Sequence, residues 1–167
     1  MKLETRNQKP KSRRREQIIL YAPLLIWIGV IFLLSSGQGA STRTSLIIRP
    51  ILEFLFPTAP EETLQLYHGL IRKCAHLTEY AILGLLACRS FINLSAASFR
   101  KYYYLLAAVL VFIVASADEF NQSFNPERTS SPIDVLIDLT GGVCGILIFL
   151  LWTRKRSRKP AFDGIGT

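Results

Sequence analysis

Cysteine and histidine are scarce in this chain, which contains three residues of the first kind and two of the second. The cysteines, Cys74, Cys88 and Cys144, are odd in number, lie among apolar residues and lack the spacing of zinc ligands. We therefore expect no disulfide framework and no zinc finger, and we interpret the cysteines as small buried residues. A nucleic-acid-binding motif is also missing, so the net charge of +8 needs another explanation.

Charged residues are rare within four long apolar stretches of the sequence. The first, residues 18–36, is free of charge, and the others cover approximately residues 74–92, 102–120 and 133–152. A helix of about 20 residues crosses the roughly 30 Å hydrocarbon core of a bilayer. The sequence thus predicts an all-α polytopic membrane protein, a bundle of four transmembrane helices. The first stretch exceeds the usual apolar length of a cleavable signal peptide, so we expect it to be retained.

Basic residues indicate how these helices are oriented. Fifteen of the twenty Lys and Arg residues lie near the two ends of the chain or around the link between the second and third stretches. Because Lys and Arg accumulate in short cytoplasmic segments, both termini are predicted to be cytoplasmic. This rule and attraction to anionic lipids account for the positive charge. The predicted organisation is a basic cytoplasmic segment at residues 1–17, a membrane domain at 18–152 and a basic cytoplasmic tail at 153–167.

Acidic residues show the opposite distribution. Only Glu4, Glu16 and Asp163 lie on the predicted cytoplasmic side. The other nine lie in or next to the outer half of the membrane domain: Glu53, Glu61, Glu62, Glu79, Asp118, Glu119, Glu127, Asp134 and Asp138. An ionisable group in hydrocarbon costs on the order of 3 kcal/mol or more unless it is paired or faces water. We therefore expect the acids within predicted helices to point into the bundle.

Three predicted helix ends bring polar residues to one membrane level. In chain order they carry His76, Glu79 and Tyr80, then Asp118, Glu119 and Gln122, then Asp134 and Asp138. His76, Glu79 and Tyr80 share one helix face because they are spaced i, i+3 and i+4. Adjacent carboxylates at a helix C-terminus repel each other and oppose the helix dipole, so Asp118 and Glu119 need cationic partners, protonation or a metal. The available counter-charges are Arg72, Lys73 and Arg128.

The outer segment before the second helix alternates apolar and charged residues. Residues 45–56 predict a short helix in the outer interface. Residues 58–71 are expected to form a lid or collar over the polar layer, with His68 as an interfacial residue.

The start of the fourth helix has both structural and functional interpretations. Asp134 suits helix capping and a functional role equally well, whereas Asp138 lies too deep in the helix for capping. Gly141 and Gly145 form a small-xxx-small pair, which allows another helix to approach closely.

Two longer stretches complete a specific pattern with the first apolar stretch. They are RKCAHLTEYAILGLL at residues 72–86 and SADEFNQSFNPERTSSPIDVLIDLTGGVCG at 116–145. Together they resemble the VanZ-like family of small bacterial membrane proteins over most of residues 18–150. The resemblance implies a plasma-membrane protein, one relative of which contributes to teicoplanin resistance in Gram-positive bacteria, and it implies no established reaction. Asp138 departs from the family pattern, which commonly has Asn there.

The resemblance and the polar layer together define a candidate site. The candidate catalytic residues are His76, Glu79, Asp118 and Glu119, and the candidate substrate-binding residues are Lys73, Tyr80, Gln122, Arg128, Asp134 and Asp138. In an enzyme or ligand-binding protein of the outer leaflet, His76 would act as acid or base, Glu79 would orient it, and Arg128 would hold an anionic head group. The carboxylate oxygens of this site, together with one imidazole, would also suit a divalent metal. No contiguous metal motif occurs, so metal and cofactor stay undetermined.

A second hypothesis is a non-enzymatic membrane scaffold or partner-binding protein, in which the same charges form ion pairs that hold the helices together. The sequence leaves open whether the protein is an enzyme. Membrane lipids are the expected partners, with a lipid-linked envelope precursor or a glycopeptide as the candidate ligand and no nucleic acid. Transport is a weaker hypothesis, because the inner halves of the four stretches are almost purely apolar.

Overall fold

The computed structural model describes residues 10–35, 42–94, 96–123 and 132–157, and within these ranges it is all-helical, without a β-strand. The all-α prediction is therefore confirmed for the part of the chain that is described. The helices are α1 (Pro10–Ser35), α2 (Thr42–Leu55), α3 (Glu61–Phe91), α4 (Ala97–Arg100), α5 (Tyr103–Gln122) and α6 (Pro132–Ser157).

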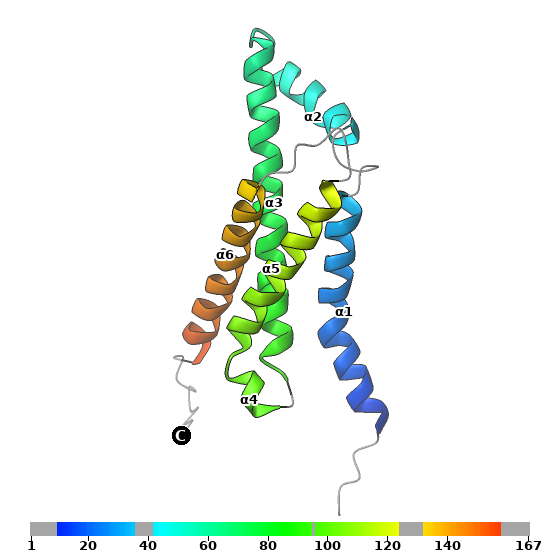
Figure 1. Ribbon diagram of the computed structural model, residues 1–167, viewed down its shortest axis with the longest axis vertical. Coiled ribbons are helices and arrows are strands. Elements are labelled where there is room, and N and C mark those ends of the chain that lie inside the picture. The colour runs from blue at the N-terminus through cyan, green and yellow to red at the C-terminus, as the bar shows by residue number, and fades with distance from the viewer. Residues whose placement is uncertain (1–9, 36–41, 95, 124–131, 158–167) are drawn as a thin grey trace, which may run out of the picture.

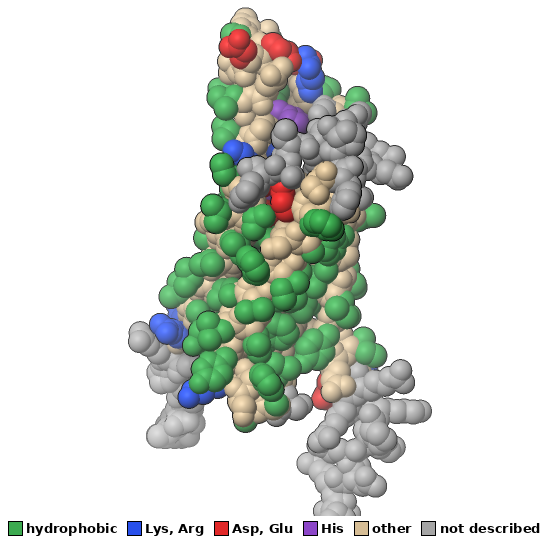
Figure 2. All heavy atoms as spheres, viewed as in Figure 1, with side chains coloured by type: hydrophobic (Ala, Val, Ile, Leu, Met, Phe, Trp, Pro, Cys, Tyr) green, Lys and Arg blue, Asp and Glu red, His purple; other side chains and the backbone are tan. Residues whose placement is uncertain are grey.

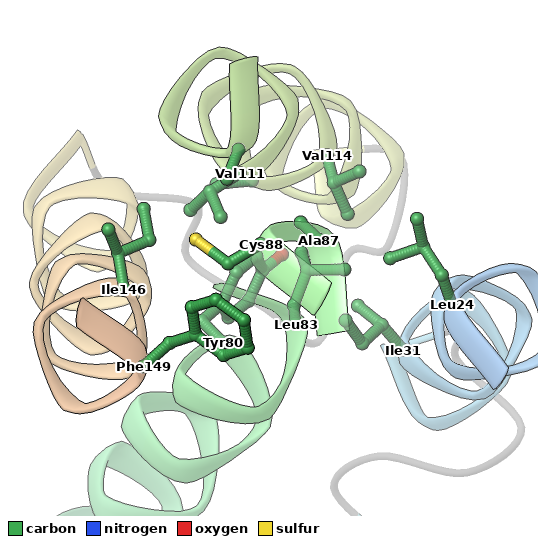
Figure 3. Close-up of a cluster of buried hydrophobic side chains, with 12 residues drawn as sticks. Leu24, Ile31, Tyr80, Leu83, Ala87, Cys88, Val111, Val114, Ile146 and Phe149 are labelled. Atoms are coloured by element: carbon green, nitrogen blue, oxygen red, sulfur yellow. The ribbon is translucent and has the colours of Figure 1, made fainter. Parts of the chain in front are cut away.

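Helix α3 is the centre of the structure. It packs against α1, α5 and α6, which stand around it, while α2 packs on the part of α3 that projects beyond the bundle (Figure 1). Figure 3 shows that the core consists of α3 side chains enclosed by those of the three neighbours. Its labelled members are Tyr80, Leu83, Ala87 and Cys88 of α3, Leu24 and Ile31 of α1, Val111 and Val114 of α5, and Ile146 and Phe149 of α6.

The outer surface of the bundle is apolar. Leu25, Leu33, Phe112 and Leu151 are each more than half exposed. Hydrophobic side chains cover the middle of the face in Figure 2, and charged side chains gather toward its two ends. A water-soluble protein rarely exposes so much contiguous apolar surface, whereas lipid tails cover it without cost.

Three described helices are long and apolar enough to cross a membrane. They comprise Arg15–Ser35 in α1, Tyr103–Gln122 in α5 and Ile133–Arg156 in α6. These segments match three of the four predicted spans. The fourth predicted span, residues 74–92, which lies in α3 except for its last residue, is not among them, because polar and charged residues lower its hydropathy. Its crossing of the membrane stays a prediction.

The segment before the bundle differs from the predicted collar. Residues 61–71 continue directly into the rest of α3, so that one helix of 31 residues replaces two separate elements. The predicted short helix is present as α2 and is tied to α3 by Arg49, which binds Glu53 at 2.8 Å and Glu61 at 2.9 Å. Its hydrogen bond with Glu53 and the charge of Glu61 raise the pKa of Arg49. His68 borders the small cavity between α2 and α3.

The cysteine prediction is wrong for two of three residues. Cys88 is buried in the core, but Cys74 and Cys144 are exposed. Helical periodicity accounts for this difference, because it turns those two positions away from the neighbouring helices.

Glycines set the close approach of α3 and α6. A Cβ atom on Gly141 would overlap the backbone carbonyl of Leu77, and one on Gly145 would overlap that of Ala81. On the other helix, a Cβ on Gly84 would overlap the carbonyl of Gly142. The prediction that Gly141 and Gly145 permit close helix packing is therefore confirmed. No larger residue fits these positions unless the two backbones separate.

We expect Gly145→Ala to lower the free energy of unfolding by at least about 2 kcal/mol, because the new methyl group meets backbone rather than a side chain that can rotate. The matched control is Gly29→Ala in α1, where nothing lies within 4 Å of the position that a Cβ would take, and the same change should be neutral or slightly stabilising. Unfolding by SDS titration in mixed micelles measures both. Equal stability of the two variants would contradict the packing described for α3 and α6.

Candidate functional site

Polar residues of three helices meet at one end of the bundle, where α1 and α5 end and α6 begins. We call this the acidic end. His76 of α3, Asp118 of α5 and Asp138 of α6 each offer a ligand atom there, and the three atoms lie within 4.8 Å of one another. The carboxyl-bearing residues are almost entirely enclosed, since Asp118 is 0% exposed and Asp138 is 2% exposed. The His76 side chain is 19% exposed.

The glycine contacts explain why His76 and Asp138 face each other. Gly141 lies against the backbone of Leu77, the residue after His76, and Asp138 precedes Gly141 by about one helical turn. The close approach of the helices therefore brings the two side chains to the same level. His76 Nδ1 lies 3.4 Å from Asp138 Oδ1, which is an ion-pair distance but does not meet hydrogen-bond geometry.

Helix α5 contributes a carboxylate held by its own last turn. Gln122 follows Asp118 by four residues, and its Nε2 donates to Asp118 Oδ2 at 2.8 Å. The same Nε2 group donates to Ser35 Oγ at the end of α1, at 2.6 Å. Gln122 is itself buried. This amide fixes the orientation of the Asp118 carboxylate and links α1 to the cluster.

Three buried oxygen atoms in this region have no hydrogen-bond partner among the described residues. They are Asp118 Oδ1, Asp138 Oδ1 and the hydroxyl of Tyr80, a residue that interacts electrostatically with both aspartates. Buried polar groups are normally paired, because desolvation without a partner costs free energy. Asp118 and Asp138 also repel each other when both are ionised. The described residues therefore do not supply these carboxylates with all the hydrogen-bond donors or positive charge that they need.

A small cavity of about 10 Å³, roughly the space of one water molecule, borders the cluster. Two basic side chains, two members of the cluster and three neighbouring residues line it: Arg72, Lys73, His76, Asp138, Gln122, Asp134 and Ile137. A larger cavity, about 800 Å³, lies elsewhere, between the C-terminal parts of α3 and α6. It is mostly apolar, and its polar lining residues are Arg89, Asn93, Thr153 and Arg156. None of the predicted site residues lines that cavity.

The other predicted site residues lie at varying distances from the centre. Lys73 and Asp134 line the small cavity. Glu79 is half-buried and acts electrostatically on His76. Glu119 is also half-buried and is not one of the three clustered residues. Arg128 lies outside the described residues.

Sequence reasoning missed two residues that support the site. Ser35 binds Gln122, although nothing in its sequence context distinguishes it from neighbouring Ser36. Trp27 donates from Nε1 to the backbone carbonyl of Glu79 at 2.9 Å. An indole paired with a backbone carbonyl leaves no periodic signal, so the sequence alone could not reveal this bond.

The geometry permits two kinds of chemistry. An imidazole beside a carboxylate is an arrangement for proton transfer, in which the carboxylate orients the ring. One imidazole and two carboxylates from separate helices also form a ligand set for a divalent ion. His76, Asp118 and Asp138 are the described residues that would hold such an ion.

We expect Asp118→Asn, measured with a chelator present, to change the free energy of unfolding by less than about 1 kcal/mol or to increase it, since the amide removes an uncompensated buried charge and still accepts a hydrogen bond from Gln122. Gln122→Ala, which removes both bonds of that amide, should cost about 1–2 kcal/mol. The free energy of unfolding of both variants is measured by the SDS titration in mixed micelles described for Gly145→Ala. A loss of roughly 3 kcal/mol or more in Asp118→Asn would instead indicate an ion-paired structural network.

Comparison with known proteins places the chain in a family. A family model described as VanZ/LLP1 matches residues 18–153, which is most of the sequence. Neither a curated protein nor a solved structure shows significant similarity to the chain. The matched region includes most of each apolar helix and all three residues of the cluster, His76, Asp118 and Asp138. The chain therefore belongs to the VanZ/LLP1 family, and its apolar helices are those of a membrane protein.

Proposed function

We propose that the acidic end faces the outside of the bacterial plasma membrane and binds an anionic group of a lipid-linked or cell-envelope molecule. The observation that carries this proposal is the cavity beside the cluster of His76, Asp118 and Asp138, where Arg72 and Lys73 lie next to His76. The two basic side chains attract the anionic group, and a hydroxyl or amide of the same molecule can donate to the carboxylate oxygens that the fold leaves unpaired.

The orientation rests on the distribution of charge. The basic residues near both ends of the chain favour a cytoplasmic location for the opposite end of the bundle, where α6 finishes with Arg154, Lys155 and Arg156. We propose that α3 is the fourth crossing. Its neighbours α1, α5 and α6 enclose much of it, so α3 needs less apolar surface of its own than a lipid-facing helix does. Four crossings return both termini to the cytoplasm.

Each group in the site has a chemical role under this proposal. Asp138 faces Nδ1 of His76, so Nε2 is the nitrogen left to donate to, or exchange a proton with, a bound molecule. Arg72 and Lys73 provide positive charge at the cavity for a phosphate or carboxylate. Three roles stay predictions of the sequence: Glu79 orienting His76, Glu119 acting with Asp118 as a cation ligand or second acid/base pair, and Arg128 holding an anionic head group.

The alternative scaffold function requires ion pairs that hold the helices together. Within the described ranges, Arg72 and Lys73 form no ion pair with the buried aspartates, and His76 with Asp138 is the sole such contact in the cluster. That pattern supports a binding site more than a structural network. Lowered susceptibility to teicoplanin-type glycopeptides is the cellular effect that we propose for this site.

The proposed topology can be tested at the two ends of α3. We expect Glu62→Cys, in a protein with its three native cysteines replaced, to react with a membrane-impermeant maleimide on intact cells. Asn93→Cys, just beyond the other end of α3, should react only after the cells are permeabilised. Labelling of both positions from the same side would show that α3 does not cross the membrane.

The functional test compares the two histidines of α3. In a susceptible Gram-positive host, the wild type should raise the teicoplanin concentration that stops growth, and His76→Ala at equal membrane abundance should abolish that increase. His68→Ala is the matched control, because His68 lies beside α2 rather than in the cluster, and it should behave as wild type. An equal increase with His76→Ala would remove His76 from the mechanism, and no increase with wild type would refute the resistance effect.

A further inference from the structure

We infer that His76, Asp118 and Asp138 bind one divalent transition-metal ion, of the class of Zn²⁺ or Mn²⁺, at the acidic end of the bundle. This inference goes beyond the proposed function and does not depend on it, since an ion could bind whether or not an envelope molecule does. It rests on the donor atoms, their spacing, and buried oxygens that no described residue satisfies.

The donor set selects the kind of ion. One imidazole nitrogen and two carboxylate oxygens suit Zn²⁺ and Mn²⁺, whereas Ca²⁺ and Mg²⁺ prefer oxygen alone and soft ions prefer sulfur. The exposed Cys74 and Cys144 are not members of the cluster. Each of the three ligands comes from a different helix, so an ion would join α3, α5 and α6 at one point.

The spacing fits two ligands of one ion better than a hydrogen bond. His76 Nδ1 and Asp138 Oδ1 are 3.4 Å apart without hydrogen-bond geometry. Two atoms that each lie about 2.1 Å from a tetrahedral ion are separated by roughly 3.4 Å. The Asp118 ligand atom is within 4.8 Å of the others, so small side-chain rotations would bring all three to bonding distance.

Charge and burial point to the same conclusion. Asp118 is 0% exposed and Asp138 is 2% exposed, and each retains an oxygen without a partner among the described residues. A doubly positive ion with a neutral imidazole and two carboxylates has no net charge, which removes the repulsion between the aspartates in a low-dielectric bundle. Over the described ranges, no Lys or Arg forms an ion pair with either aspartate.

The neighbouring polar groups are arranged as supports for a bound ion. Gln122 holds Oδ2 of Asp118 at 2.8 Å and leaves Oδ1 for the ion, as ligand-orienting residues do in metal sites. Three protein ligands leave a coordination position open, and the small cavity beside His76 and Asp138 gives a place for a water molecule or an anionic oxygen there. We assign Gln122 as a positioning residue.

The test measures metal binding directly by the full-length protein in detergent, after treatment with a chelator. Because thiolates bind Zn²⁺, all three cysteines are first replaced. Titration with Mn²⁺, followed by electron paramagnetic resonance, should give one bound ion per chain with nitrogen coupling from an imidazole. Zn²⁺ should compete for the same site and raise the temperature of unfolding.

Variants then assign the ligands. His76→Gln, Asp118→Asn and Asp138→Asn should each weaken Mn²⁺ binding at least tenfold, and His76→Gln should also remove the nitrogen coupling. Gln122→Leu should weaken binding by about tenfold through the orientation of Asp118. His68→Gln is the matched control, and it should bind as the unsubstituted protein does.

Two results would overturn the inference. One is a folded protein that binds neither Mn²⁺ nor Zn²⁺ at millimolar concentration, as expected if the two aspartates share a proton instead. The other is binding without imidazole coupling, which would place the ion elsewhere. The coupling is recorded with all three ligands intact, so the inference stays testable if a variant fails to fold. No lipid or antibiotic is present, so failure here and failure of the proposed function are distinguishable.

Discussion

Close contact between the backbones of α3 and α6 is the constraint on which the rest of the structure depends. Gly84, Gly141, Gly142 and Gly145 allow it, because each lies where a side chain would meet the other helix or α5. The contact fixes the register of the two helices, and the register decides which polar residues face each other. A shift of one helical turn would move Asp138 away from the level of His76 and separate the two side chains.

The acidic end combines tight packing with unsatisfied polarity. Apolar packing along α3 stabilises the fold. The cluster beside the middle of α3 destabilises it, since buried carboxylates without partners oppose folding. Natural proteins keep such groups where binding or chemistry requires them. The core is well packed, whereas the acidic end retains buried oxygens without hydrogen-bond partners among the described residues. This difference is the physical reason for placing function at the acidic end rather than in the larger apolar cavity.

Local patterns predicted much of the fold and part of the site. Apolar length identified α1, α5 and α6, and the spacing of Gly141 and Gly145 correctly indicated a close helix contact. The pairing of His76 with Asp138 rather than with Glu79 could not be predicted, because it depends on how two helices are rotated about their axes. The bonds of Ser35 and Trp27 depend on tertiary distance and leave no trace in the sequence.

The origin of the cluster in three helices has a consequence for biosynthesis. Asp118 and Gln122 lie on the same helix and Ser35 precedes them in the chain, so their hydrogen bonds can form as soon as α5 enters the membrane. His76 pairs later, because Asp138 and the α6 glycines that pack against α3 are synthesised after α5. Until α6 inserts, the newly made chain exposes both an unpaired imidazole and a bare helix face. Release of a chain shortened before α6 would therefore present the cell's membrane proteases with an incompletely assembled protein.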